Sequence, residues 1–276
     1  VSALNDSFKF ETQRASSIVS NGKKKVWRVI TRSGRTIEAT ANHPFRTFEG
    51  WSHLNSLKKG TRIAVPRILH YTPTKRITRA QARALGYLLS EGNLCHPSGI
   101  YFYSKSELEI KDFCNATKGF SNVQCTIDRS KPAIAVYVRK KDLREDNGLF
   151  KWCKSLGILG KKAIEKNIPP MLFSVTRAQL AECIGTMWQG DGCIFPKKDG
   201  QIFYATSSKQ LVEDLQHLLL RFGIISTIYT KKFRYRGGYK IGYTLNISRY
   251  TNIELFAKWI GPYLIGTKKK MLAEMV

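Results

Sequence analysis

Two acidic residues, Glu91 and Asp191, occupy matching places 100 residues apart in this 276-residue chain. Each ends an apolar stretch and is followed by a glycine, in LGYLLSEG (85–92) and IGTMWQGDG (184–192). Two carboxylates that lie close together repel each other unless a cation sits between them. Hard divalent cations take oxygen ligands, and paired metal sites support displacement at a phosphodiester. The pair therefore indicates metal-dependent phosphodiester hydrolysis, provided that the fold brings the two acids together.

Each stretch alone has a simpler interpretation. Apolar residues at helical spacing usually form a core helix, and an Asp-Gly pair usually forms a turn. The second stretch becomes informative because the first one resembles it. Both contain small residues that would let two helices approach closely, namely Gly86, Ser90, Gly185, Thr186 and Gly190. We expect the two helices to pack side by side, with both acids at the same end of the pair.

The elements around these helices are repeated as well. After residue 76 the pattern alternates between helices and pairs of strands, and YFYSKSELEIKDF in the first part resembles FYATSSKQLVEDL in the second. Because such a repeat decides the architecture, we predict two pseudo-symmetric αββαββα units over residues 77–170 and 171–276. A linker at 67–76 and a small, glycine-punctuated all-β segment at 1–66 precede them. The predicted fold class is α+β.

The charge of the chain indicates a polyanionic partner. Lysine and arginine number 46 against 20 acidic residues, so the formal net charge is +26. The basic residues are spread through the chain, which favours a folded surface lying along nucleic acid; a merely soluble basic protein is the alternative. No apolar run approaches the ~18 residues of a membrane span, and no signal peptide opens the chain. The six cysteines lack metal-ligand spacing and are interpreted as reduced thiols, so we expect a cytoplasmic protein with no membrane partner.

The two acid-ended stretches resemble the paired motifs of LAGLIDADG homing endonucleases in their single-chain, two-copy form. This resemblance implies catalytic and metal-binding roles for Glu91 and Asp191, with Gly92 and Gly190 as further metal ligands, and Mg²⁺ or Mn²⁺ as the cofactor. The first motif departs from the family pattern, because it has Glu91 where an aspartate is usual and Leu85 where a small residue is usual.

A lysine accompanies each acid in this family. The segment EKNIP (165–169) is similar to one found before the second motif of intein-borne members, and the match assigns Lys166 to a place near the active site. The corresponding lysine of the second copy is one of Lys268, Lys269 and Lys270, and Lys270 is taken as the candidate. The alternative for this run is an ordinary solvated surface.

The strand pairs of each copy form the candidate DNA surface. AIAVYVRK, which contains Arg139, and TKKFRYRGGYKIGY alternate basic and aromatic residues with apolar ones. Alternate residues of a strand share a face, and a basic, aromatic face matches a groove lined by phosphates and base edges. We predict that Lys232, Arg234, Arg236 and Lys240 lie largely on one face. The implied partner is double-stranded DNA with a long asymmetric target site, bound by a monomer.

The first 66 residues resemble a different module. ATANHPFRTFEGW, followed by LKKGTRIAVPR, is similar to the splicing (Hint) domain of inteins, particularly those in replicative DNA helicases. The resemblance implies that Thr40 and His43 act at the N-terminal splice junction. Inteins begin with Cys or Ser and end in Asn, whereas this chain starts at Val1 and ends in LAEMV. We therefore expect a partial Hint domain that does not splice by itself.

The sequence thus predicts an intein-type, Mg²⁺-dependent DNA endonuclease attached to part of a splicing domain, with a replicative DNA helicase as the candidate host protein. Two alternatives stay open. One is a nucleic-acid-binding protein on the same scaffold that does not cleave. The other is a protein-splicing element with a decayed nuclease.

Overall fold

The computed structural model describes residues 1–276 except 6, 98, 197–199 and 236. The chain divides into two units, Val1–His70 and Tyr71–Val276. The division between them falls inside the segment 67–76 that the sequence marks as a linker.

Unit 1 consists of short antiparallel strand pairs. β1 (Ser2–Leu4) pairs with β2 (Phe10–Thr12), β3 (Val26–Ile30) with β4 (Thr36–Thr40), and β5 (Pro44–Arg46) with β6 (Trp51–His53). A single turn of 3-10 helix follows at Leu54–Ser56. β3 and β4 form a hairpin around Ser33-Gly34, and Gly34 has the positive φ of 83° that such turns favour.

Apolar side chains of unit 1 are mostly exposed. In the described part of this unit, Ala39 is the one buried hydrophobic residue. Ile18 and Phe48 are 98% and 97% exposed, and Trp51 is 62% exposed. Unit 1 therefore has almost no core of its own.

Unit 2 is built around two neighbouring helices, α1 (Arg79–Ser90) and α4 (Arg177–Asp191). Both begin with the phrase Thr-Arg-Ala-Gln, in which the threonine caps the helix and the glutamine completes a capping box. A Cβ atom at Gly86 of α1 would lie 2.5 Å from the carbonyl oxygen of Cys183 and 2.6 Å from Cβ of Thr186 on α4. Glycine at this position is therefore what allows the two helices to touch. Gly185, in contrast, faces Tyr263 and Ile260.

Each of these helices leads into a four-stranded antiparallel sheet. The first sheet has the order β7 (Gly92–Asn93), β8 (Ile100–Ser104), β10 (Ile134–Arg139), β9 (Gln124–Asp128). The second has the order β11 (Gly192–Phe195), β12 (Gln201–Thr206), β14 (Gly238–Ile247), β13 (Thr227–Tyr235). Counted along the chain, the two sheets have the same strand order.

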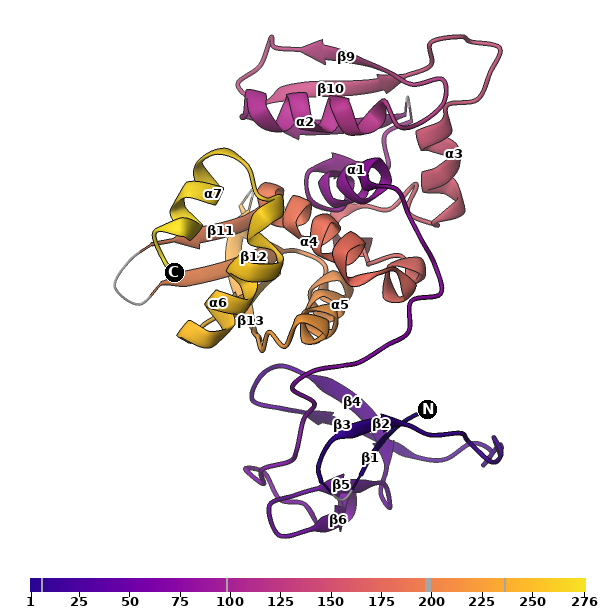
Figure 1. Cartoon of the computed structure of the whole chain (residues 1–276), viewed down its shortest axis with the longest axis vertical. Helices are drawn as coiled ribbons and strands as arrows, with labels where there is room; N and C mark the ends of the chain where they lie inside the picture. The colour runs from indigo at the N-terminus through magenta and orange to yellow at the C-terminus, as the bar shows by residue number, and fades with distance from the viewer. Residues whose placement is uncertain (6, 98, 197–199, 236) are drawn as a thin grey trace. The chain divides into compact units, whose positions relative to one another are not determined.

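The remaining helices are divided between two halves of unit 2. α2 (Glu107–Thr117) and α3 (Gly148–Ser155) belong to the part before α4, called here the first half (77–170). α5 (Lys209–Leu219), α6 (Tyr250–Trp259) and α7 (Gly266–Ala273) belong to the second half (171–276). Figure 1 shows each half grouped around its own sheet, with α1 and α4 between them. The α+β class is confirmed.

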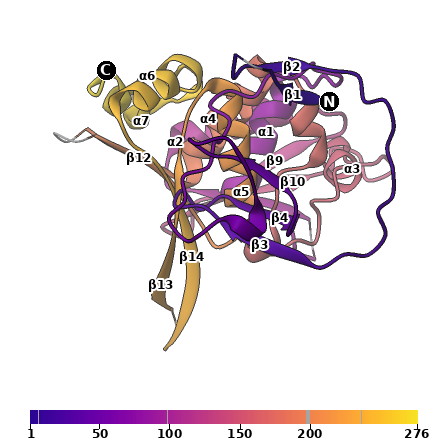
Figure 2. The ribbon, with the colours of Figure 1, turned by 90° about the horizontal axis from the view of Figure 1, so that it is seen from below.

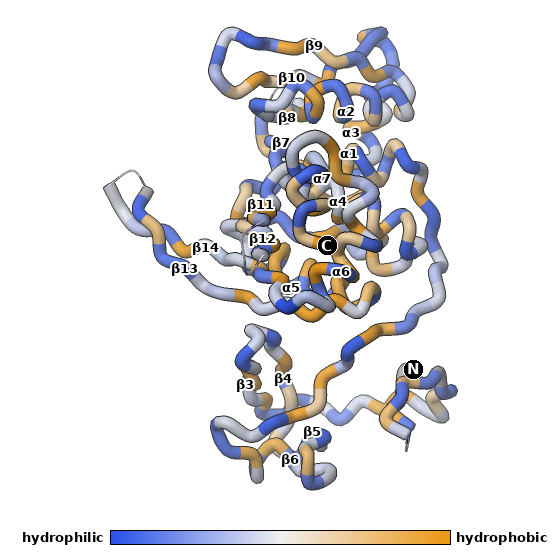
Figure 3. Tube along the Cα trace, turned by 60° about the vertical axis from the view of Figure 1, so that its left-hand side comes forward, coloured by the Kyte–Doolittle hydropathy of each residue, from blue (hydrophilic) through white to orange (hydrophobic). Residues whose placement is uncertain are grey.

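One face of each sheet packs into the core of unit 2. Phe102 and Val136 of the first sheet and Tyr204 and Leu245 of the second are fully buried. Strands β13 and β14 continue beyond this core as a two-stranded ribbon, which both Figure 2 and Figure 3 show extending away from the helices. Among the described residues, no helix combines the length and the apolar content that a membrane crossing requires.

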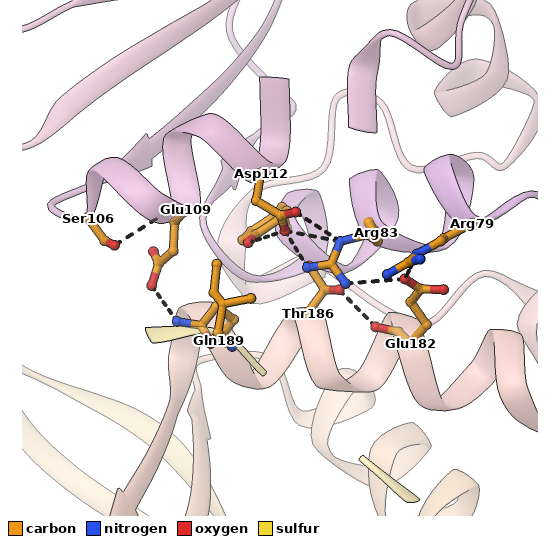
Figure 4. Close-up of polar contacts among 10 residues, drawn as sticks. Arg79, Arg83, Ser106, Glu109, Asp112, Glu182, Thr186 and Gln189 are labelled. Atoms are coloured by element: carbon orange, nitrogen blue, oxygen red, sulfur yellow. Dashed lines mark hydrogen bonds and ion pairs between the residues drawn. The ribbon is translucent and has the colours of Figure 1, made fainter. Parts of the chain in front are cut away.

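A buried ion network joins three helices of unit 2 (Figure 4). Arg83 of α1, 8% exposed, bonds to Asp112 of α2 and to Glu182 of α4, the latter at 3.2 Å. Tyr87 donates to Asp112 at 2.7 Å, and Arg79 donates to Glu182 at 2.8 Å. Because buried charges are tolerated only when they are paired, this network constrains how α1, α2 and α4 can pack.

Candidate active site

The structure brings Glu91 and Asp191 together. Glu91 caps the C-terminus of α1 and Asp191 is the last residue of α4. Gly190, next to Asp191, packs on the first acid, since a Cβ atom there would lie 2.3 Å from Oγ of Ser90 and 3.0 Å from Cγ of Glu91. The two carboxylates therefore emerge at the same end of the helix pair, as their spacing in the sequence predicts.

The electrostatics of the two acids show that they share a site. Burial and the nearby charge of Asp191 raise the pKa of Glu91 to about 7, and Lys166 opposes the rise. Burial also raises the pKa of Asp191, while Lys166 and a hydrogen bond from Tyr204 oppose that rise. Both carboxylates are thus costly to ionise without a cation beside them.

Tyr204 distinguishes the two acids. Its hydroxyl donates to Oδ2 of Asp191 at 3.3 Å. In the sheet registers Gly192 pairs with Tyr204, and Gly92 pairs with Phe102. The position that gives Asp191 a hydrogen-bond donor is therefore filled by a phenyl ring in the first half. The sequence analysis did not identify Tyr204, and only an alignment of the two halves would reveal the exchange.

Lys166 lies at the end of the first helix, as predicted. Its ammonium donates to the carbonyl oxygens of Leu88 at 3.1 Å and Ser90 at 2.8 Å, and the residue is 7% exposed. Burial lowers the pKa of Lys166, and the charges of Asp191 and Glu91 oppose this effect. The lysine therefore holds the end of α1 and faces both acids.

The corresponding lysine of the second half is Lys268 and not Lys270. Nζ of Lys268 donates to the carbonyl oxygens of Trp188 at 3.0 Å, Gln189 at 2.5 Å and Gly190 at 2.9 Å, at the end of α4. Lys270, selected from the sequence, is exposed on α7. Three consecutive helical residues point in different directions, roughly 100° apart, and only the first of the three points toward α4.

The oxygen atoms at the helix ends define what the site could hold. Two carboxylates are suited to a hard divalent cation such as Mg²⁺. Of the two glycines assigned as further ligands, Gly190 uses its carbonyl oxygen to accept from Lys268, and Gly92 is buried at the start of β7. Within the described residues, no group of three or more His, Cys, Asp or Glu side chains is arranged to hold a metal. Glu91 and Asp191 are the acids that lie at the two helix ends.

The open face of the second sheet carries a different set of basic residues from the predicted one. In β13 and β14, Lys232 pairs with Ile241, Arg234 with Tyr239, and Phe233 with Lys240. Because paired residues share a face, Lys240 lies on the face opposite Lys232 and Arg234, so the prediction of one common face is wrong for Lys240. Arg236 lies outside the described residues.

The face that includes Lys240 is the one next to the acids. Lys231 and Phe233 line a pocket of about 490 Å³ together with Lys166, Asp191 and Phe203. The sequence analysis did not identify Lys231, because the alternation alone does not say which face of the strand adjoins the helix ends. Lys232 lies on the other face, over the ring of Tyr239 at 4.6 Å.

The open face of the first sheet is rich in tyrosine. Tyr137 of β10 pairs with Tyr101 of β8, and their rings lie 4.7 Å apart. Tyr103 lies beside them, and Arg139 stacks over Tyr137 at 5.5 Å. Arg139 is exposed on this open face, where the sequence predicts a contact with DNA.

Thr40 and His43 lie in unit 1. Thr40 is the last residue of β4 and His43 follows the turn after it, and the amide of His43 donates to the carbonyl oxygen of Thr40 at 3.0 Å. The His43 ring packs edge-on against Phe45 and is exposed. The two residues are neighbours in space, and this contact between them is through the backbone.

Part of the second half matches a known family. Residues 178–261 match the family described as LAGLIDADG-like domain. The chain is 33% identical over 279 residues to the replicative DNA helicase DnaB of Rhodothermus marinus. This alignment covers 97% of the chain and 29% of the helicase. It is 30% identical over 231 residues to the RecA protein of Mycobacterium tuberculosis, in an alignment that covers 79% of this chain and 28% of that protein. The chain thus spans less than a third of each relative.

Among solved structures, the full-length DUF199/WhiA protein from Thermatoga maritima is similar over 72% of this chain and 60% of its own, with 14% identity and a TM-score of 0.45.

Proposed function

We propose that residues 71–276 form a site-specific DNA endonuclease of the LAGLIDADG homing type, built from two such repeats. Residues 1–70 would belong to the splicing (Hint) module of an intein, with Thr40 and His43 at its active site. The observation that carries the endonuclease proposal is the meeting of Glu91 and Asp191 at the ends of two packed helices, each accompanied by a lysine.

The surroundings of the acids favour DNA as the substrate. Basic and aromatic residues lie on the open faces of both sheets, with Arg139 and Tyr137 on the first and Lys231, Phe233 and Lys240 on the second. Side chains of this kind bind phosphates and contact base edges. With a net charge of +26, the chain would bind duplex DNA over a long, asymmetric site as a monomer.

The relatives support an inserted element. The matching stretch occurs in a replicative DNA helicase and in a RecA protein, two proteins with different names. A segment of this length that recurs inside otherwise different proteins is what an intein carrying a homing endonuclease would produce. A replicative DNA helicase is accordingly the proposed host.

The side chains at the helix ends would have separate tasks. Glu91 and Asp191 would hold the divalent cation, Mg²⁺ or Mn²⁺. A bound cation of this kind activates water and stabilises charge at the phosphate. Tyr204 would orient the Asp191 carboxylate through its hydrogen bond. Lys166 and Lys268 would place positive charge where the phosphate becomes more negative.

The second candidate is a DNA-binding protein that does not cleave. This candidate includes the case of an intein whose nuclease has lost its activity. The observation in its favour is the weaker first motif, in which Glu91 replaces the usual aspartate and Phe102 occupies the position equivalent to Tyr204.

Plasmid cleavage separates the two candidates. The substrate carries an uninterrupted replicative helicase gene across the insertion point, and it is incubated with Mg²⁺, Mn²⁺ or EDTA. Metal-dependent linearisation at that point, lost in Asp191→Asn, is the expected result. Salt-sensitive binding without cleavage in either metal would favour the non-cleaving candidate. The absence of both binding and cleavage would contradict both candidates.

A further inference from the structure

Ser208, in the second half of unit 2, contacts the segment that carries the lysine of the first half. We propose that Ser208 is a positioning residue for Lys166, so that the second half holds the lysine that serves the end of α1. The inference rests on the proposed nuclease function for its catalytic consequence. The anchoring itself is a property of the fold, and it can be tested without DNA.

The contact is direct and buried. Oγ of Ser208 donates to the carbonyl oxygen of Lys166 at 2.5 Å, and Ser208 is fully buried. The side chain of the same lysine extends to the carbonyl oxygens of Leu88 and Ser90 at the end of α1. One residue therefore connects the N-terminus of α5 with the acid-bearing end of α1.

A second bond fixes the same segment. The amide of Ile168 donates to Oδ2 of Asp214 at 3.0 Å, and Ile168 is 2% exposed. Ser208 caps α5 and Asp214 belongs to α5. The segment 166–168 is thus fastened at two points to one helix of the second half, which limits both its sliding and its rotation.

The equivalent serine of the first half lacks this contact. Ser106 caps α2 by accepting from the amide of Glu109, as Ser208 caps α5 by accepting from Leu211. Each serine amide also donates to a hydroxyl two residues earlier, in Ser104 and Thr206 respectively. Among the described contacts, the Ser106 hydroxyl bonds only within its own helix. Ser106→Ala therefore removes the same kind of cap without touching a lysine segment.

Loss of the Ser208 hydroxyl would have a specific consequence. The carbonyl oxygen of Lys166 would lose its donor in a buried place, where an unpaired polar group is costly. The segment would relax toward another partner and displace the ammonium from the end of α1. A displacement of about 1 Å at a catalytic group reduces a rate by about 100-fold.

Amide hydrogen exchange tests the anchoring in the whole chain, without DNA or metal. In Ser208→Ala we expect the amides of residues 163–168 to exchange about tenfold faster than in the wild type. Ser106→Ala should leave them unchanged. Equal exchange of this segment in both variants would overturn the proposal. If Ser208→Ala does not fold, Asp214→Ala is expected to accelerate the same amides, and unchanged exchange there would overturn it.

Single-turnover cleavage of a duplex labelled on each strand tests the consequence. Lys166→Met identifies the strand that depends on this lysine. Ser208→Ala should slow that strand about 10- to 100-fold and leave the other unchanged, so that nicked DNA accumulates. Ser208→Thr, which keeps the hydroxyl, should restore the rate, and Ser106→Ala should not slow this strand. Equal slowing of both strands would contradict positioning. A wild-type chain that cuts neither strand would refute the proposed function, and exchange alone would then decide on the anchoring.

Discussion

At the scale of single residues, the two lysines at the helix ends are the most informative side chains after the acids. Lys166 and Lys268 both donate to backbone carbonyl oxygens of the helix that carries the neighbouring acid. A lysine that caps a helix in this way also satisfies carbonyl groups left unpaired at its C-terminus. The same residues thus stabilise the fold and place positive charge beside the acids.

Lys268→Met should reduce the proposed cleavage by roughly 100- to 1000-fold, because it removes a positive charge next to the reacting phosphate. Lys270→Met is the matched control, since Lys270 is exposed on the same helix, and it should stay within about twofold of the wild type. Single-turnover cleavage with saturating enzyme measures both. Equal losses would show that α7 contributes charge without a specific lysine.

Glu91 should make the metal-free protein less stable at alkaline pH. Its folded-state pKa of about 7 lies above the usual value of a glutamate. The stability contributed by the protonated acid is complete below pH ~4.5 and is lost as pH rises through about 7. In EDTA, Glu91→Gln should therefore gain about 1 to 2 kcal/mol relative to the wild type between pH 5 and pH 8, after allowance for solvent screening.

Urea unfolding at the two pH values measures this difference. Glu274→Gln, at an exposed position at the end of α7, is the control and should show no such gain. A gain for Glu91→Gln that is the same at both pH values would mean that the carboxyl does not titrate in this range.

The acids and Lys166 could be predicted from the sequence, because each belongs to a phrase of several residues with a known place in a fold. Lys268 could not. The run Lys268–Lys270 offers three candidates, and the choice depends on the orientation of α7, a helix that the sequence analysis did not predict. Tyr204 escaped notice because its role depends on sheet register, which pairs it with Gly192.

At the scale of elements, the β13–β14 ribbon shows what alternation can and cannot predict. The pattern correctly indicates two long paired strands. The face on which Lys240 lies depends on the pairing of Tyr235 with Gly238 across the turn, because a shift of one residue moves every side chain to the other face. Helix α2 (Glu107–Thr117), in contrast, is indicated by its cap and its apolar spacing, which are local signals.

The two faces of the ribbon should differ in DNA binding. Lys231→Ala with Lys240→Ala removes charge from the face next to the acids, and should reduce the slope of log affinity against log salt by about 2. Lys232→Ala with Arg234→Ala removes equal charge from the opposite face and should change the slope less. Fluorescence anisotropy with a labelled duplex over a range of salt concentrations measures both slopes. Equal slopes would indicate that net charge alone determines the affinity.

The ion network between α1, α2 and α4 should contribute strongly to stability. Asp112→Asn weakens the bonds to the buried Arg83 and to Tyr87, and should lower the free energy of unfolding by about 2 to 4 kcal/mol. Glu107 lies on the same helix as Asp112, and Glu107→Gln breaks its exposed pair with Arg129. This variant is the control and should leave the unfolding midpoint nearly unchanged. Denaturant unfolding measures both, and similar losses would contradict the distinction.

At the scale of the whole molecule, the two units differ in how they are held together. The extensive core lies in unit 2, whereas Ala39 is the one buried hydrophobic residue in the described part of unit 1. The sequence indicates both a change of pattern near residue 66 and an all-β first part. It does not reveal how little of the first part is buried, because short alternating strands look alike whether or not something covers them.

Limited proteolysis should separate the two units. Backbone with few buried contacts opens more easily and is cut first. At low protease concentration we expect cleavage within residues 1–76 and a resistant fragment that begins near Tyr71, identified by mass spectrometry. A fragment that retains Ile18 and Phe48 would show that unit 1 is protected. The Asp112→Asn variant provides the comparison, since it should shorten the lifetime of the resistant fragment.

The two halves differ at one equivalent position, which holds Tyr204 in the second half and Phe102 in the first. This difference has a consequence for how such a chain can evolve. Two identical subunits must accept every mutation twice, so their sites stay equal. A single chain with two such sites accepts each mutation once, and here Asp191 has the Tyr204 hydroxyl beside it, whereas the equivalent strand position of the first half holds Phe102. The two halves of the proposed nuclease are therefore free to cut at different rates, and Phe102→Tyr or Tyr204→Phe, each of which makes the two positions alike, offers a designer a one-residue way to bring the two cuts closer in rate.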